Sequence, residues 1–282
     1  MKTIIITDSA SDIAQNLYEN VRVLPMTITF GDREYKDGVN LSHKRFYELL
    51  VESEELPVTS QISPYEFGEA MEEALKTADA VLVITMSSKL SGTYQSAVLA
   101  ASEYPGKVFP VDSENVTVGE HMLVEYANRL LHMGKTPEEV VKELDSIKKR
   151  IRVVGLLDTL EYLKKGGRIS KAAAFAGNVL SIRPVVTVKD GAVEILGKAR
   201  GSKQANNLIV EAIHNSGGVD FDLPYFLGYT GLNDDLLQKY IRDNAALWEE
   251  KTDYLPISTV GGTIGTHVGP GAIVVAWIGL EQ

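Results

Sequence analysis

The chain has 282 residues, of which 44% are hydrophobic and 23% are charged, and this predicts one large or two modest globular domains. A net charge of −10 argues against a nucleic-acid-binding protein, because a phosphate backbone requires a basic surface. The absence of cysteine excludes disulfides, thiolate metal sites and cysteine nucleophiles. No apolar run is long enough for a signal peptide or a membrane span, so we expect a cytoplasmic location.

Strands and helices alternate through the first half of the chain. Continuous apolar runs rich in β-branched residues, typical of buried parallel strands, predict the first and third strands. The predicted strands are residues 2–7, 21–30, 80–85 and 107–112. The predicted helices are residues 41–51, residues 92–101 and two that begin at Ser63 and Thr136. Ser63 and Thr136 are each a hydroxyl cap that is followed by Pro at the first helical position and by Glu at the third. This alternation predicts βαβ units and a parallel sheet.

The second half of the chain mixes a hairpin with strand–helix units. The sequence Lys189-Asp190-Gly191-Ala192 predicts a hairpin turn, and a hairpin among such units indicates a mixed sheet. The predicted strands are residues 152–157, 185–188, 193–196 and 225–229, with one more before a glycine-rich end. The predicted helices are residues 159–165, residues 171–180, one between the hairpin and the strand at residues 225–229, and residues 234–248. We therefore expect an N-terminal α/β domain with a parallel sheet over residues 1–150 and a mixed-sheet α/β domain over residues 151–282.

Positive charge is concentrated in one segment of this acidic chain. Residues 148–203 hold 13 of the 28 Lys and Arg but four of the 38 acids, which gives +9, against −19 for the remainder. One interpretation is a solvated basic face. The other is a docking surface for an acidic partner, a phosphoryl group or anionic lipid, the last implying a transient contact with a membrane surface.

Two polar loops of the first half lie beside predicted strand and helix ends, where open α/β sheets collect their ligands. The TDSASD segment at residues 7–12 follows the first strand, and it could receive a ligand or Mg²⁺ or merely cap a turn and helix. Thr59-Ser60-Gln61 precedes the helix that begins at Ser63. Unpaired N–H groups at a helix start suit a carboxylate or phosphate, although simple capping would use the same residues.

Two further loops carry hydroxyl groups, glycines and a histidine. Residues 87–93 (SSKLSGT) hold four hydroxyl side chains, and Gly92 would let a ligand approach the backbone closely. Residues 261–271 are rich in glycine, and we expect a mobile loop there in which His267 contacts a ligand. No Walker, serine-hydrolase, zinc-protease or dinucleotide-binding motif occurs, and five scattered histidines give a metal site little support. Neutral hydroxyl donors are what a buried carboxylate requires.

Several motifs, in order along essentially the whole chain, resemble the DegV family. They are TDSASD, VTSQISP, SSKLSGTYQSA, VDSENV, LDTLEYLKKGGRIS, LSIRPVV and IGTHVGPGAI. The resemblance implies a two-domain α/β fold that binds one long-chain fatty acid between its domains, without a cofactor and without catalysis of its own. Some members are binding subunits of bacterial fatty acid kinase, and they present the acid to a separate kinase that forms acyl-phosphate for phospholipid synthesis.

The resemblance also implies the residues of the site. The fatty-acid carboxylate would be held by hydroxyl, backbone and imidazole groups of Thr59, Ser60, Ser91, Gly92, Thr93 and His267. Arg168 would belong to the surface that meets the kinase, and Lys165 and Arg200 lie in the same positive segment. Ile62 stands where many members have proline, which changes a loop residue and not a donor.

Two other functions fit the same loops. Ser91 and His267 could act as nucleophile and base in acyl transfer or hydrolysis, with Asp8 or Asp112 as the orienting acid. Alternatively, these loops, with their hydroxyl and backbone N–H donors, could bind the phosphate of a phosphorylated metabolite or a nucleotide.

Overall fold

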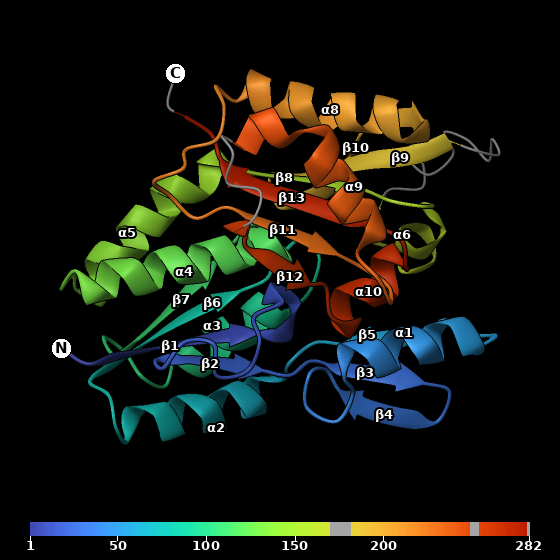
Figure 1. Cartoon of the computed structure of the whole chain (residues 1–282). Coiled ribbons are helices and arrows are strands. Elements are labelled where there is room, and N and C mark those ends of the chain that lie inside the picture. Colours follow the sequence, from blue (N-terminus) through green and yellow to red (C-terminus); the bar gives the residue numbers. More distant parts are fainter. Residues whose placement is uncertain (170–181, 249–253, 281–282) are drawn as a thin grey trace.

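The computed structural model describes residues 1–169, 182–248 and 254–280. Within these ranges the chain forms three sheets (Figure 1). A parallel sheet has the strand order β2-β1-β6-β7, a small antiparallel sheet has the order β4-β3-β5, and a mixed sheet has the order β10-β9-β8-β13-β11-β12. The predicted class is therefore confirmed as α/β, with one parallel and one mixed sheet.

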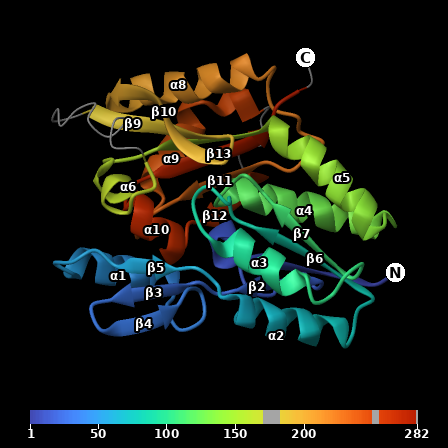
Figure 2. The ribbon, with the colours of Figure 1, turned by 180° about the vertical axis from the view of Figure 1, so that it is seen from behind.

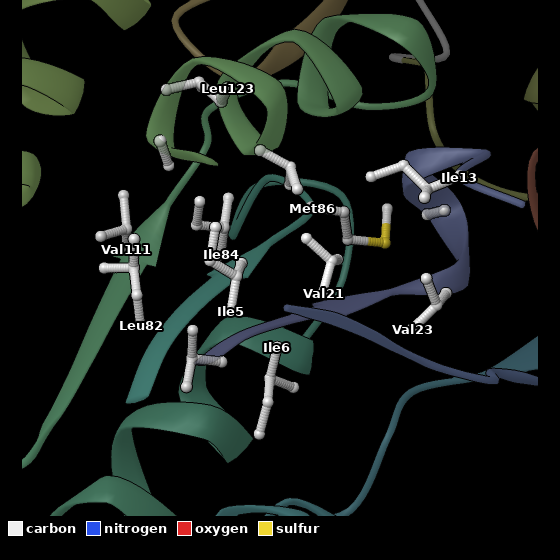
Figure 3. Packing of buried hydrophobic residues seen from close by; sticks show 14 of the residues in the cluster. Ile5, Ile6, Ile13, Val21, Val23, Leu82, Ile84, Met86, Val111 and Leu123 are labelled. Atoms are coloured by element: carbon white, nitrogen blue, oxygen red, sulfur yellow. The ribbon is translucent and has the colours of Figure 1, made fainter. Parts of the chain in front are cut away.

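The parallel sheet forms from the β-branched runs that predicted it. Its strands are β1 (Thr3–Asp8), β2 (Val21–Leu24), β6 (Ala80–Thr85) and β7 (Val108–Asp112). Ile5, Leu82 and Ile84 pack together below Leu123 of α4 (Val118–His132), whereas Ile6 projects from the opposite face (Figure 3). Helices α2 (Pro64–Leu75), α3 (Thr93–Ala101) and α5 (Pro137–Ile147) complete this part of the molecule.

Local sequence signals placed several helices correctly but did not predict α4. Ser63 and Thr136 both form capping boxes with the Glu at the third helical position, as predicted. The strand predicted over residues 21–30 is wrong as a single element. It divides into β2 and β3 (Thr27–Phe30), which belong to different sheets, because Pro25 and Met26 redirect the chain between them.

The small sheet pairs β3 with β4 (Arg33–Lys36) and β5 (Val58–Ser60), and α1 (His43–Glu52) packs on it. Gly31 and Asp32 form the turn of the β3–β4 hairpin. Ile28, Phe46 and Tyr47 form the buried centre of this layer.

The mixed sheet presents one face to α8 (Gly201–Asn215) and α9 (Asp235–Asp243). Its strands are β8 (Ile151–Leu156), β9 (Ile182–Lys189), β10 (Ala192–Arg200), β11 (Phe226–Tyr229), β12 (Ile257–Thr259) and β13 (Ile273–Ile278). The hairpin β9–β10 is confirmed. The helix predicted over residues 234–248 is too long, since α9 ends at Asp243 and a short 3-10 turn (Ala245–Trp248) follows. The helix predicted over residues 171–180 lies outside the described residues.

The glycine-rich C-terminal segment is a helix and not the loop that was expected. Helix α10 (Gly262–Val268) lies between the mixed sheet and the small sheet in both views (Figures 1 and 2), beside the short helix α6 (Glu161–Lys165). Gly262 and Gly265 pack against Phe46 at distances where a Cβ atom would lie 2.8 and 2.6 Å from the ring, so glycine is required for this close approach.

The chain passes from the parallel sheet to the mixed sheet through α4 and α5, just before β8. One hydrophobic core nevertheless contains residues of both sheets, including Ile5, Val153 and Val274. The domain boundary at residue 150 therefore stays a prediction. Over the described ranges, no helix combines the length and the apolar character needed to cross a membrane.

Candidate ligand-binding site

His267 on α10 and Thr59 on β5 meet although 208 positions separate them. The Oγ1 atom of Thr59 lies 2.9 Å from Nε2 of His267. Thr59 is half-buried whereas its neighbours Val58 and Ser60 are exposed, as the alternation of a strand dictates. Side-chain direction along β5 thus brings Thr59 to the imidazole and turns Ser60 away from it.

The second ring nitrogen of His267 is buried, and it lacks a hydrogen-bond partner among the described residues. Gly166 closes over it so tightly that a Cβ atom there would lie 2.3 Å from Nδ1. Burial, followed by the positive charge of Arg168, lowers the pKa of His267 to about 4. The imidazole is therefore neutral at pH 7, with one N–H to donate.

Ser91 and Thr93 form a second hydroxyl pair at the start of α3. Their hydroxyl oxygens are 2.9 Å apart, and the Thr93 backbone N–H donates to Ser91 Oγ over 3.3 Å. Gly92 occupies the N-cap position between them, and a Cβ atom there would lie 2.1 Å from the Oε1 atom of Gln61. Gln61 in turn donates to Ser96 Oγ over 3.0 Å. A Cβ atom at position 92 would therefore force the end of the Gln61 side chain to shift.

A partly polar cavity joins these groups. Its volume is about 520 Å³, part of it open to solvent, and Thr59, Gln61, Ser91, Arg168 and His267 line it beside apolar neighbours. The structure therefore gathers three predicted carboxylate ligands, Thr59, Ser91 and His267, at one place. Ser60, Gly92 and Thr93 do not line the cavity, and their predicted contact with the ligand stays a prediction.

An apolar cavity adjoins the polar one, and its empty volume of about 540 Å³ includes space that is open to solvent. Val116, Leu163, Val193, Ile264 and Val268 line both cavities, so the two share a wall. The deeper lining comes from the inner face of the mixed sheet and from loops. It includes Val153, Gly155, Val186, Val188, Val260 and Val274. No sequence signal identified these residues, because their assembly depends on which faces of β8, β9 and β13 point inward.

The three predicted docking residues differ in their surroundings. Arg168 lines the polar cavity, where it donates to the carbonyl oxygens of Gly166 over 2.6 Å and Leu90 over 3.3 Å. Lys165 at the end of α6 and Arg200 at the end of β10 are exposed. A role in binding a partner stays a prediction for all three.

The TDSASD segment caps structure instead of facing the cavities. Asp8 accepts from the backbone N–H groups of Ala10 (3.0 Å) and Met86 (2.9 Å). Asp12 accepts from Gly261 N (2.7 Å) and from the Thr117 hydroxyl. Burial raises the pKa of Asp8 to about 6 and that of Asp12 to about 8. Of the two interpretations left open for this segment, the structure favours capping.

The described part of the chain contains no cluster of three or more His, Asp and Glu side chains arranged to hold a metal ion. The buried acids of the TDSASD segment are instead occupied by backbone and hydroxyl donors, such as Met86 N on Asp8.

The sequence profile of the DegV family, whose description is "uncharacterised protein", matches residues 2–280. The chain belongs to the DegV family. A DegV domain-containing protein of Caldanaerobacter subterraneus subsp. tengcongensis is 36% identical over 276 residues, which cover 96% of each chain.

Solved DegV structures share this fold over the whole chain. A DegV family protein from Thermus thermophilus, described with its fatty-acid binding, has a TM-score of 0.86 and 36% identity, covering 99% of this chain and 100% of its own. DegV of Bacillus subtilis, described as a fatty acid binding protein, has a TM-score of 0.84 and 30% identity, with coverage of 99% and 100%. Relatives of this chain thus bind fatty acids in the same fold.

Proposed function

We propose that this protein binds one long-chain fatty acid, with the carboxylate in the polar cavity and the acyl tail in the apolar cavity. The observation that carries the proposal is that a polar and an apolar cavity lie side by side, with lining residues such as Val116, Ile264 and Val268 in common. A ligand that fills both must have a polar head and a long apolar tail. The fatty-acid binding of its DegV relatives supports this choice of ligand.

The polar cavity offers neutral donors for a carboxylate. The hydroxyl groups of Thr59 and Ser91 can each donate one hydrogen bond. Neutral His267 can donate from Nε2, the atom beside Thr59 Oγ1, in the tautomer that carries the proton there. Hydrogen bonds to an ionised acceptor are stronger than neutral ones, which offsets part of the cost of desolvating the head group. A bound carboxylate would also raise the pKa of His267, because it favours the charged imidazole.

Burial of the tail supplies most of the affinity. Each methylene removed from water contributes about 0.8 kcal/mol, so a dozen would contribute on the order of 10 kcal/mol. That gain offsets the loss of translational and rotational freedom on binding and the desolvation of the carboxylate.

We also propose that the protein presents the acid to a separate kinase and does not catalyse a reaction itself. Lys165 and Arg200 are exposed cations that an acidic or ATP-bearing partner would favour. Alanine at each should leave lipid affinity unchanged and lower acyl-phosphate formation by the kinase. Normal turnover with both variants would refute the docking surface. Arg168 is the weaker probe, because its side chain lines the cavity.

An acyl-transfer enzyme built on Ser91 and His267 is less well supported. Ser91 Oγ is paired with Thr93, and no carboxylate among the described residues orients His267, whose Nδ1 atom has no partner. The proposed orienting acids are occupied elsewhere, Asp8 by Met86 N and Asp112 by Ser88 N. Ester hydrolysis that disappears in Ser91→Ala would reinstate this function.

The first test is native mass spectrometry of the purified protein, together with lipid extraction under denaturing conditions. We expect one fatty acid per chain. The absence of lipid, combined with no uptake of added palmitate or oleate, would refute the proposal and favour the phosphorylated-metabolite alternative.

Matched variants then test the head-group site. Thr59→Val and His267→Ala should each weaken fatty-acid binding about tenfold, since each removes one charge-assisted hydrogen bond. Ser60→Ala is the control on the same strand, where the exposed hydroxyl points away from the cavity. Equal affinity for all three variants would contradict the assignment, and a loss in Ser60→Ala would restore that residue to the site.

A further inference from the structure

Gly155 stands in the middle of a central strand, where glycine is unusual. It pairs with Val274 on β13 and with Val186 on β9. Glycine weakens a strand interior because it adds backbone freedom and has no side chain to pack, and it often marks a place that a ligand approaches closely. Both of its strand neighbours line the apolar cavity, as Gly155 does.

A side chain at position 155 would point into the apolar cavity. Successive residues of a strand face opposite sides, and Val153, Gly155 and Leu157 all line the cavity. Val154 and Leu156 belong instead to the core on the other face of the mixed sheet. Gly155 therefore forms a notch between Val186 and Val274 in the cavity wall.

Packing within the protein does not require glycine at this position. A Cβ atom on Gly155 would meet its nearest neighbour, Val186 Cγ2, at 3.4 Å, and the next two atoms at 3.7 Å, all ordinary contacts. Its φ is also outside the left-handed region that favours glycine. By contrast, a Cβ atom on Gly92 would lie 2.1 Å from Gln61. What glycine supplies at position 155 is empty volume inside the cavity.

We infer that Gly155 determines the length of acyl chain that the protein accepts, by leaving the room in which the distal methylenes lie. The inference rests on the proposed fatty-acid binding and adds a specificity determinant to it. Gly155 lines the apolar cavity and not the polar one, so a side chain there would displace tail and not carboxylate. Each displaced methylene costs about a fourfold loss in affinity.

The test measures the affinities of saturated fatty acids of increasing length for the full-length protein. Gly155→Ala should weaken the binding of the longest acids by about fourfold, and Gly155→Val by on the order of fiftyfold, corresponding to about one and three methylenes. The affinity of a twelve-carbon acid should stay within about twofold in both variants, so the preferred length becomes shorter.

Val154→Ile is the matched control, because it adds one carbon to the same strand on the opposite face. Its length profile should match that of the unsubstituted protein. An unchanged profile in Gly155→Ala, or an equal loss for every chain length in both Gly155 variants, would overturn the inference. If the unsubstituted protein binds no fatty acid, the proposed function fails first, and that outcome is distinct from binding with an unchanged profile.

Discussion

The two ends of helix α10 both carry polar groups away from water, but they differ in how those groups are satisfied. At the N-terminal end, Asp37 accepts from Gly262 N (3.1 Å), Thr263 N (2.9 Å) and Thr263 Oγ1 (2.6 Å). At the C-terminal end, His267 meets Thr59, and its Nδ1 atom has no partner among the described residues.

This difference distinguishes polar groups that stabilise the fold from polar groups that are available to bind a ligand. Carboxylates at the N-terminus complete the free N–H groups of the first turn and are favoured by the helix dipole, so that end is closed to further ligands. The C-terminal end borders a cavity, and it keeps donors that can turn to a carboxylate. Acidic residues near a helix start therefore do not by themselves indicate a site, whereas neutral hydroxyl and imidazole donors that border a cavity can reorient toward a ligand.

The largest expected effect of a substitution on stability is at the N-terminal end of α10. Asp37→Ala removes the acceptor of three hydrogen bonds and leaves two backbone donors buried, so the free energy of unfolding should fall by about 3 kcal/mol or more. Urea unfolding measures this loss, with Asp32→Ala as an exposed control. A decrease below about 1 kcal/mol would show that Asp37 does not hold the helix start.

The next effect is a pH dependence at the same end. Asp12 has a pKa of about 8 in the folded protein against an ordinary value of 3.8, chiefly because it is buried. The folded state therefore binds this proton more tightly than the unfolded state, and the stability that it provides is lost as the pH rises from 3.8 through 8.

Asp12→Asn removes that titration while keeping the shape of the side chain. The fall in unfolding free energy between pH 5 and 7 should become shallower by up to about 1.4 kcal/mol per pH unit. Urea titrations at several pH values measure the slope. Parallel slopes in the two proteins would mean that Asp12 is ionised when folded.

Sequence predicted the elements whose causes are local. The β-branched runs of β1 and β6 and the capping boxes at Ser63 and Thr136 depend on neighbouring residues, and all are confirmed. Helix α10 was expected to be a loop because glycine disfavours helices. It forms because distant acids, such as Asp37, complete its first turn and because its glycines permit close packing on α1.

The site was predictable only in part, for the same reason. The loops that hold Thr59 and His267 were identified from their residue types, but only the resemblance to the DegV family implied that the two residues share one site, because no spacing rule joins positions 208 apart. The apolar lining, Gly155 included, depends on the register of β8 with β9 and β13. Ser60 adjoins Thr59 in sequence but faces away, which only the pairing of β5 reveals.

The smallest expected effect on stability is at the C-terminal end of α10, which borders the polar cavity. Thr59→Val removes one hydrogen bond to a half-buried partner, so the unfolding free energy of the lipid-free protein should fall by less than about 1 kcal/mol. Urea unfolding after delipidation measures this change. A loss as large as that of Asp37→Ala would erase the distinction between the two ends of α10.

The central claim is tested most directly by a crystal structure of the protein with bound stearic acid. The account predicts the carboxylate within hydrogen-bond distance of Thr59, Ser91 and His267, with the tail passing Gly155 on the inner face of the mixed sheet. A carboxylate located elsewhere, such as at the start of α10 beside Asp12 and Asp37, or a tail outside the apolar cavity, would contradict it.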